Sequence, residues 1–194
     1  MSHTTAVAAV LLASGFSRRF GACKLMYPFK DENGETQTMV ERCAKHLFAA
    51  VPDAVVVVRD DDTAVQAVLQ KNRYPWVSNP MASEGMSAAI RCGIEYFVDA
   101  SGWVLALGDM PYIPAGVYGQ VAEALRDGAA IAQPQYHGQG GHPVGFSRIY
   151  QQALLQLQGD VGGREILRAH KKRIRCINVD SPGILQDVDS PNQL

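Results

Sequence analysis

The residues best suited to chemistry lie in a short cationic loop near the N-terminus. The apolar run from Ala6 to Leu12 predicts a buried parallel strand. The segment from Ala13 to Leu25 follows it directly and contains two arginines, one lysine and two glycines. Gly15 and Gly21 allow the backbone to approach a ligand closely. Because backbone N–H groups and fixed cations at a strand end bind phosphate in many folds, the loop predicts a phosphate site rather than a solvated basic surface loop.

Two common phosphate-binding motifs do not fit this loop. The P-loop requires G-x-x-x-x-G-K-[ST], but Gly21 lies one residue too far from Gly15, and Lys24 does not follow Gly21 directly. The dinucleotide fingerprint requires G-x-G-x-x-G, whereas Gly15 is followed by Phe16 and Ser17. A loop rich in cations and poor in glycine is suited to a ligand that is held at several phosphates.

The composition limits the classes of protein that the chain can belong to. It has 194 residues, of which 47% are hydrophobic and 19% charged, and its net charge is −1. This length predicts a single domain over residues 1–194. The near-neutral charge argues against nucleic acid or an anionic membrane as a partner. Because no segment resembles a signal peptide or a transmembrane span, we expect a cytoplasmic protein.

The cysteines and histidines do not form a recognisable metal or redox motif. The four cysteines lack C-x-x-C spacing, and the five histidines lack zinc-type spacing. Reduced thiols in a cytosolic protein are the favoured interpretation. Cys23 lies inside the cationic loop, where arginine and lysine are expected to lower the pKa of its thiol, so a reactive thiol stays open there as the less favoured alternative.

Apolar runs alternate with helical patterns along the chain, which predicts an α/β fold with a mostly parallel sheet and crossover helices. A small antiparallel addition is expected at Val144 to Phe146, and Ile174 to Val179 is expected at a sheet edge. The other predicted strands are Ala6–Ala13, Ala54–Val58, Trp76–Ser78, Trp103–Leu107 and Ala129–Ala132. The predicted helices begin at about Thr38 and span about 63–71, 87–97, 115–125, 149–157 and 163–169.

Several aspartates follow predicted strands or lie in extended segments. Asp109 comes just after the strand that ends at Leu107, and ligands of open α/β sheets bind beyond the carboxyl ends of the strands. A turn-capping role is the alternative for Asp109. Asp187 and Asp189 alternate as on one face of an extended segment, and solvated carboxylates are the alternative there.

Two helix starts carry polar residues that need separate interpretations. The triplet from Asp60 to Asp62 is interpreted as an N-cap with acidic residues near the positive end of the helix dipole, rather than as a metal site. The helix start near Gly85 and Ser87 is a second place where backbone donors are expected to point outward, toward a ligand.

The order of these motifs along the chain resembles that of MobA-like nucleotidyltransferases. The segment Leu12 to Lys24 is similar to the family signature L-A-A-G-x-S-x-R-M/F-G-x-x-K, with Ser14 where the family usually has Ala or Gly. The ending Asp187-x-Asp189-Ser-Pro looks closest to the molybdenum cofactor cytidylyltransferase branch, because the guanylyltransferase branch usually has L-A-G-G and Asn in place of the C-terminal aspartates. Other similar segments, including the Gly-His-Pro of this branch, are Asn79-Pro80, Gly85–Ser87, Gly108–Pro111 and Gly141–Val144.

This resemblance implies a three-layer, Rossmann-like nucleotidyltransferase fold and a Mg²⁺-dependent transferase. The implied reaction moves CMP from CTP onto a phosphate monoester acceptor such as molybdopterin and releases pyrophosphate. An attacking phosphate is largely ionised at neutral pH, because its second pKa is about 6. The reaction therefore needs relief of charge repulsion and in-line positioning more than a strong protein base.

The resemblance also implies roles for particular residues. Arg19, Lys24 and Asp109 are the expected catalytic residues, with Arg19 and Lys24 neutralising the triphosphate. Mg²⁺ is expected on Asp109 and Asp189, with Asp187 as the competitor of Asp189. The expected nucleotide-binding residues are Leu12, Ala13, Ser14, Gly15, Lys24, Gly85, Ser87 and Asp109, and the expected acceptor-binding residues are Gly141, His142 and Pro143. Transient contact with a molybdoenzyme or its chaperone is a further implication.

Three alternatives stay open from the sequence. One keeps the chemistry but changes the substrates, as in a guanylyltransferase or another sugar- or cofactor-phosphate nucleotidyltransferase. The second is a dinucleotide-binding oxidoreductase, against which the failed G-x-G-x-x-G match argues. The third is a catalytically silent binding module, against which the presence of Arg19, Lys24 and Asp109 argues. His142 is equally compatible with a structural role, and Arg164 with either an acceptor phosphate or solvent.

Overall fold

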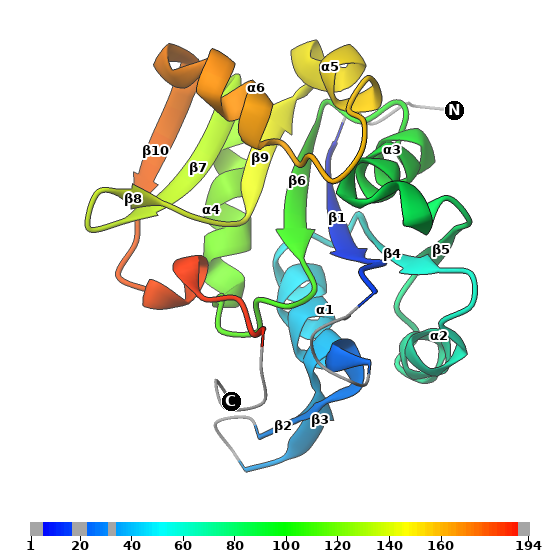
Figure 1. Ribbon diagram of the computed structural model, residues 1–194. Helices are drawn as coiled ribbons and strands as arrows, with labels where there is room; N and C mark the ends of the chain where they lie inside the picture. Colours follow the sequence, from blue (N-terminus) through cyan, green and yellow to red (C-terminus); the bar gives the residue numbers. More distant parts are fainter. Residues whose placement is uncertain (1–5, 17–22, 31–33, 190–194) are drawn as a thin grey trace.

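The structure is a computed structural model that describes residues 6–16, 23–30 and 34–189. Within these ranges a central eight-stranded sheet has the order β10-β7-β9-β6-β1-β4-β5, with β8 paired to β7 (Figure 1). The strands of this sheet are β1 (Val7–Ala13), β4 (Ala54–Arg59), β5 (Trp76–Asn79), β6 (Gly102–Leu107), β7 (Ile131–Tyr136), β8 (Gln139–Gly140), β9 (Val144–Ser147) and β10 (Ile174–Asn178). A separate antiparallel pair consists of β2 (Pro28–Lys30) and β3 (Thr36–Thr38).

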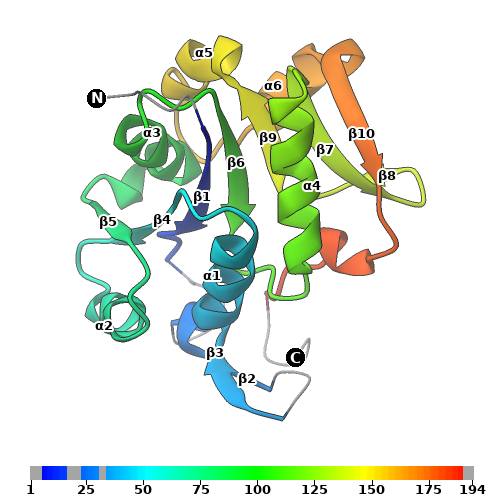
Figure 2. The same ribbon diagram turned by 180° about the vertical axis from the view of Figure 1, so that it is seen from behind.

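Helices cover both faces of the sheet, which gives the predicted three layers. One face carries α3 (Met86–Tyr96), α5 (Gln151–Leu155) and α6 (Arg164–Ala169), which lie in front of the sheet in Figure 1. The other face carries α1 (Met39–Ala50), α2 (Thr63–Lys71) and α4 (Ala115–Arg126); α1 and α4 lie in front in Figure 2.

Strand β1 lies at the centre of the sheet and is buried on both faces. Val7, Ala9 and Leu11 pack in the core beneath α1 and α4, whereas Ala8 and Val10 pack in the core beneath α3. Successive side chains of a strand point to opposite faces, so a strand that is covered twice must be apolar at every position. This explains why β1 appears in the sequence as a continuous apolar run without alternation.

The connection order opens a crevice beside β1. The chain passes from β1 to β4 and β5 on one side and then crosses to β6 on the other, with all four strands parallel. Adjacent crossovers that leave in opposite directions open a crevice at the carboxyl ends of the two strands. Leu12 of β1 pairs with Leu107 of β6, so the residues that follow these two strands emerge side by side.

The mostly parallel sheet and the antiparallel addition are both confirmed. Strand β9 inserts between β6 and β7 and is antiparallel to each of them, while β10 forms the parallel edge beside β7. Most predicted elements agree with the structure within one residue at each end. The exceptions are β7, the helix expected over 149–157, and the β2–β3 hairpin and the short strand β8, which were not predicted.

The predicted boundaries of β7 were wrong because its sequence does not follow a strand pattern. The prediction ended at Ala132, but the strand continues through Gln133, Pro134 and Gln135. Pro134 cannot donate a ladder hydrogen bond, yet its carbonyl accepts one from the Gly141 amide at 2.9 Å. Strands β8 and β10 pair with this part of β7 and supply its other backbone hydrogen-bond partners. The local order of apolar and polar residues does not reveal such pairing.

The helix predicted over 149–157 is shorter than expected. A 3₁₀ turn at Arg148–Tyr150 precedes α5, which ends at Leu155. None of the described helices is both long enough and apolar enough to span a membrane.

The close approach of α3 to β1 gives a test of the packing. A Cβ at Gly93 would lie 2.3 Å from Cγ1 of the buried Val10. Gly93→Ala should therefore lower the free energy of unfolding by about 1–2 kcal/mol, because overpacking outweighs the gain in helix propensity. Gly119→Ala in α4 is the matched control, since its Cβ would meet only Ala50 at 3.9 Å. It should stabilise by up to about 1 kcal/mol, and chemical denaturation of both variants measures the difference.

Candidate active site

A cavity of about 700 Å³ lies where β1 and β6 end. Its walls come from the segment after β1, the 3₁₀ turn Lys24–Met26, the segment between β5 and α3, the end of β6, the 159–160 loop and the C-terminal segment. The predicted nucleotide-binding residues that line it are Leu12, Ala13, Ser14, Gly15, Lys24, Gly85 and Asp109, and Asp189 lines it as well. The fold therefore gathers residues from five distant parts of the chain into one cavity.

Lys24 forms the electrostatic centre of this cavity. Its Nζ donates to Asp109 Oδ2 at 2.8 Å and to Asp189 Oδ1 at 3.1 Å. Burial alone would lower the pKa of Lys24, but its hydrogen bonds to the two carboxylates and their charges raise the pKa above its ordinary value. The ammonium group is therefore fully protonated at neutral pH and provides a fixed positive charge at the ends of the two strands.

The backbone around Asp109 is held tightly against β1. The Gly108 amide donates to the Leu12 carbonyl at 3.0 Å, and a Cβ at Gly108 would lie 3.1 Å from that same carbonyl oxygen. The Asp109 carbonyl accepts from the Val188 amide at 2.9 Å. Because these two hydrogen bonds hold the backbone before and after the Asp109 side chain, they fix the direction in which its carboxylate points.

The carboxylates suit a divalent cation that is bound partly by its substrate. Asp109 Oδ1 is buried and has no hydrogen-bond partner among the described residues, which is costly for a carboxylate oxygen unless a ligand compensates it. Within those same ranges no three His, Cys, Asp or Glu side chains gather as a metal site. Mg²⁺ commonly uses only one or two carboxylates together with substrate phosphates and water, so the donor set fits.

The C-terminal segment distinguishes the two candidate second ligands. Val188 is fully buried beside Asp109, so its neighbours Asp187 and Asp189 flank an anchored residue. Asp189 lines the cavity and contacts Lys24, whereas Asp187 does not line it. The geometry favours Asp189 for the cavity and leaves Asp187 on the side of His142, on whose pKa it acts.

Ser14 is held in the cavity wall by a hydrogen bond whose direction is determined. Asn79 Oδ1 accepts from the Met81 amide at 3.2 Å, so the amide nitrogen of Asn79 faces Ser14 and donates to its Oγ at 3.2 Å. Both side chains are buried. The Ser14 oxygen is thus an acceptor in this bond, and its own proton is available for an acceptor elsewhere.

The start of α3 differs from the prediction. The Met86 amide donates to Asp160 Oδ1 and the Ser87 amide to the Gly159 carbonyl, each at 3.2 Å. The expectation that these backbone donors point outward toward a ligand is wrong, because the 159–160 loop packs across the helix terminus. Gly85 has φ +92°, and a Cβ there would lie 2.8 Å from Asp160 Cα, so this close approach requires glycine.

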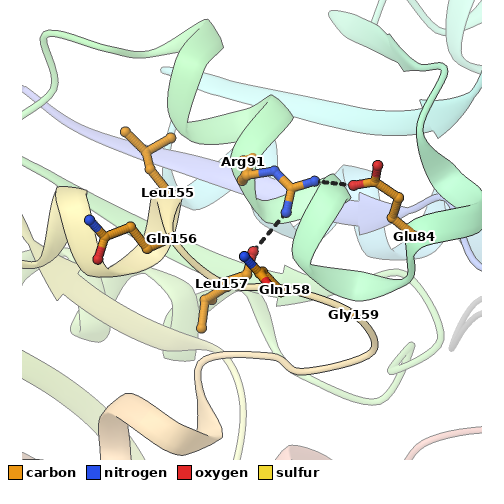
Figure 3. A pocket seen from close by; sticks show the side chains of 7 residues that line it. All are labelled: Glu84, Arg91, Leu155, Gln156, Leu157, Gln158 and Gly159. Carbon is orange, nitrogen blue, oxygen red and sulfur yellow. Dashed lines mark hydrogen bonds and ion pairs between the residues drawn. The ribbon is translucent and has the colours of Figure 1, made fainter.

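Ser87 lies behind the cavity wall. It is fully buried, does not line the cavity, and its hydroxyl accepts from Arg91 at 3.3 Å. Arg91 also donates to the Leu157 carbonyl at 2.7 Å and pairs with Glu84 (Figure 3). These side chains surround a second cavity of about 960 Å³ that shares Glu84 and Gly159 with the first. Arg91 therefore holds together the two segments that form this wall.

The predicted acceptor-binding residues lie beside the cavity and do not line it. The His142 amide donates to the Ile184 carbonyl at 2.9 Å, and a Cβ at Gly141 would overlap that carbonyl. The cis His142–Pro143 bond follows. Burial lowers the pKa of His142, and the charge of Arg164 lowers it further. The charges of Asp109 and Asp187 act in the opposite direction. The imidazole is therefore neutral at pH 7 and lies within electrostatic reach of Asp109.

Cys23 has an environment opposite to the one expected. Burial raises the pKa of its thiol. The carboxylate of Asp62 raises this pKa further; its Oδ2 accepts a hydrogen bond from Cys23 Sγ at 3.5 Å. The expectation of a lowered pKa is wrong, because an acidic side chain is its charged neighbour in the fold. Arg18 and Arg19, on which that expectation also depended, lie outside the described residues.

Several cavity residues were not predicted. Phe16 and Glu84 line it next to predicted residues, and Gly159 and Asp160 come from a loop far along the chain. The Gly159-Asp160 pair is a turn signal between two short helices. It marks a loop, but only the packing of that loop on α3 places it in the site.

The fold and the site together define a nucleotide-transfer enzyme. A profile of the MobA-like NTP transferase domain matches residues 9–174, and the chain belongs to that family. Molybdenum cofactor cytidylyltransferase of Escherichia coli (strain K12) is 22% identical over 190 residues, covering 97% of this chain and 93% of that protein. The chain is thus a nucleotidyltransferase, and the comparisons do not favour the oxidoreductase alternative.

Solved structures share the fold. Rv0371c of Mycobacterium tuberculosis H37Rv superposes with a TM-score of 0.80 at 24% identity, covering 97% of this chain and 95% of that one. A complex of Rv0371c with manganese superposes with a TM-score of 0.72 at 21% identity, covering 90% and 88% of the two chains.

The buried Ser14–Asn79 pair gives a prediction about the cavity wall. Asn79→Ala removes the donor to Ser14 and the acceptor for the Met81 amide, so the free energy of unfolding should fall by about 2 kcal/mol. Asn72→Ala is the control, because Asn72 makes comparable hydrogen bonds in an exposed place. A double-mutant cycle with Ser14→Ala measures the coupling; strictly additive effects would contradict a direct hydrogen bond.

Proposed function

We propose that this chain transfers CMP from CTP to a phosphate monoester acceptor and releases pyrophosphate. The observation that carries the proposal is the Lys24 ammonium group between Asp109 and Asp189 at the strand ends. A cation with two carboxylates beside it provides both charge neutralisation and a metal-binding edge for a triphosphate. The similarity to the E. coli cytidylyltransferase supports CTP as the nucleotide and molybdopterin as the acceptor.

The proposed bond changes need little acid–base chemistry. An oxygen of the acceptor phosphate forms a bond to the α-phosphorus of the nucleotide, and the bond from that phosphorus to the bridging oxygen breaks. Pyrophosphate leaves with the electron pair. Lys24 neutralises the charge that develops on the leaving group, and Arg19 is proposed to assist it. The residues of the site position the two anions and reduce their repulsion.

The carboxylates of Asp109 and Asp189 are proposed to hold Mg²⁺. When bound, this ion neutralises the triphosphate and the developing negative charge. The buried Oδ1 of Asp109 supports this assignment, and the manganese complex of a structural neighbour supports a divalent ion. Asp189 is preferred to Asp187, because Asp189 lines the cavity.

The remaining walls are proposed to bind the nucleoside and the acceptor. Ala13 to Gly15 line the cavity at the end of β1, and Gly85 lines it from the segment before α3, which supports binding of the base and ribose by these two segments. Ser14 then supplies a hydrogen-bond donor to the base. The acceptor is proposed to approach from the Gly141–Pro143 loop, where neutral His142 lies within electrostatic reach of Asp109. A molybdoenzyme or its chaperone is the proposed recipient of the product.

A pyrophosphate-release assay tests the reaction directly. The protein is incubated with Mg²⁺, each of the four nucleoside triphosphates, and molybdopterin or other phosphorylated acceptors. We expect release with CTP and molybdopterin. Release with GTP alone would favour the guanylyltransferase alternative over the CTP proposal. No release with any pair of nucleotide and acceptor would reject the proposed transferase reaction.

Removal of the Asp109 charge should stop the metal-dependent reaction. Asp109→Asn keeps the shape of the side chain but weakens its hold on a divalent ion, so turnover should fall at least about 100-fold. The melting temperature should stay near that of the wild type. Asp127→Asn, at the exposed C-terminus of α4, is the control and should keep full activity. Full activity of Asp109→Asn would remove Asp109 from the proposed metal site.

Removal of the Lys24 charge should slow the chemical step. Lys24→Met keeps most of the side-chain volume but leaves Asp109 and Asp189 without their shared cation. We expect kcat/KM to fall by about 10²–10³, measured as pyrophosphate release at saturating Mg²⁺. Lys45→Met, on the exposed face of α1, should behave as the wild type. Equal activities of the two variants would contradict a role for Lys24 in charge neutralisation.

A further inference from the structure

One arginine outside the predicted site contacts the segment that enters the cationic loop. Arg59 is the last residue of β4, and its guanidinium group donates to the Gly15 carbonyl at 3.0 Å. The same group lies over the ring of Phe16, 4.8 Å from the ring centroid. Gly15 and Phe16 both line the cavity, so Arg59 supports this part of the wall from behind.

Arg59 is itself held in one orientation. Its Nε donates to Asp61 Oδ1 at 2.8 Å, and its Nη2 lies 3.5 Å from Asp62 Oδ2. The guanidinium group is planar and presents its donors in a fixed fork. Two of its nitrogen atoms face carboxylates, and the third is directed to the Gly15 carbonyl.

Asp62 connects this arginine to the other end of the loop. Its Oδ1 accepts a hydrogen bond from the Val65 amide at 3.3 Å and so caps α2. Its Oδ2 accepts a hydrogen bond from Cys23 Sγ at 3.5 Å. Cys23 directly precedes Lys24. The acidic triplet therefore does more than cap a helix, because one buried carboxylate also ties the residue next to the catalytic lysine.

The surroundings of Gly15 show where this support acts. A Cβ built on Gly15 would meet no atom within 4 Å among the described residues, so that face of the backbone is open there. Arg59 contacts the segment through the Gly15 carbonyl and through the ring of Phe16. A hydrogen bond from a charged donor is among the stronger contacts available to a loop.

We propose that Arg59 is a positioning residue for nucleotide binding: it holds Gly15 and Phe16 in the conformation that lines the cavity, while Asp62 holds Arg59 and Cys23 in place. This inference rests on the proposed function for its kinetic consequence, but not for the structural one. Arg59 acts through Gly15 and Phe16, without contacting the reacting atoms itself.

Two substitutions separate positioning from simple charge balance. Arg59→Met removes the guanidinium contacts and keeps the aliphatic part of the side chain. Arg59→Lys keeps the positive charge beside Asp61 and Asp62 but loses the planar fork that also reaches Gly15. Arg148→Met is the matched control, because Arg148 also donates to a carbonyl, that of Ala100, at 3.0 Å and pairs with Asp99 at 3.9 Å, at the opposite end of the sheet.

Two measurements decide the proposal. The first is amide hydrogen exchange of the peptide covering residues 13–27 in the absence of ligand. The second is the Kd for CTP in the presence of Mg²⁺, together with separate KM values for nucleotide and acceptor. We expect both Arg59 variants to exchange faster in this peptide and to bind CTP about tenfold or more weakly. The KM for the acceptor and the kcat at saturating CTP should stay near the wild-type values, and Arg148→Met should match the wild type throughout.

The outcomes distinguish this proposal from the proposed function. Unchanged exchange and unchanged Kd in Arg59→Lys would overturn the positioning role, even if Arg59→Met failed to fold. A loss of stability without a change in the KM for nucleotide would also overturn it. If the wild-type protein bound no nucleotide with Mg²⁺, the proposed function would fail, while the exchange data would still decide whether Arg59 holds the loop.

Discussion

The site depends on one partly buried cation that is shared by two carboxylates. Lys24 follows the N-terminal loop, Asp109 follows β6, and Asp189 lies near the C-terminus, so a single ammonium group joins three distant segments. Burial of a charge is unfavourable unless it is paired. Here the attraction between Lys24 and the two carboxylates offsets the free energy that their desolvation costs. The same arrangement leaves one oxygen of Asp109 without a partner among the described residues, which is where a ligand has most to contribute.

The sheet makes this convergence possible. Parallel strands β1 and β6 end at the same edge, and the chain leaves them in opposite directions, which opens the crevice. The antiparallel strand β9 then lies against β6 and brings the His142 loop to the same edge. The C-terminal segment, drawn in red in Figure 1, returns beneath the end of β6 and is anchored by Val188.

Hydrogen bonds from side chains that do not themselves face the proposed nucleotide hold the cavity walls in place. Arg59 supports the loop after β1, Asn79 orients Ser14, and Arg91 ties the start of α3 to the carbonyl of Leu157. The first amides of α3 are used within the protein by the 159–160 loop. The amides of Met86 and Ser87 are therefore already bonded within the protein, and the proposed binding of a triphosphate would depend mainly on side chains such as Lys24.

The sequence by itself determined the order of most elements and eight of the 18 residues that line the cavity. Apolar runs revealed strands that are buried on both faces, and residues just after such runs, Ser14 and Asp109, could be assigned to the sheet edge because parallel strands end together. Tertiary structure alone decided the environments. The charge next to Cys23 is Asp62, Ser87 turns away from the cavity, Asp189 rather than Asp187 reaches Lys24, and Arg59 holds Gly15. These facts depend on contacts between residues far apart in sequence, and neither the spacing of residues nor their types records which neighbours the packing will supply.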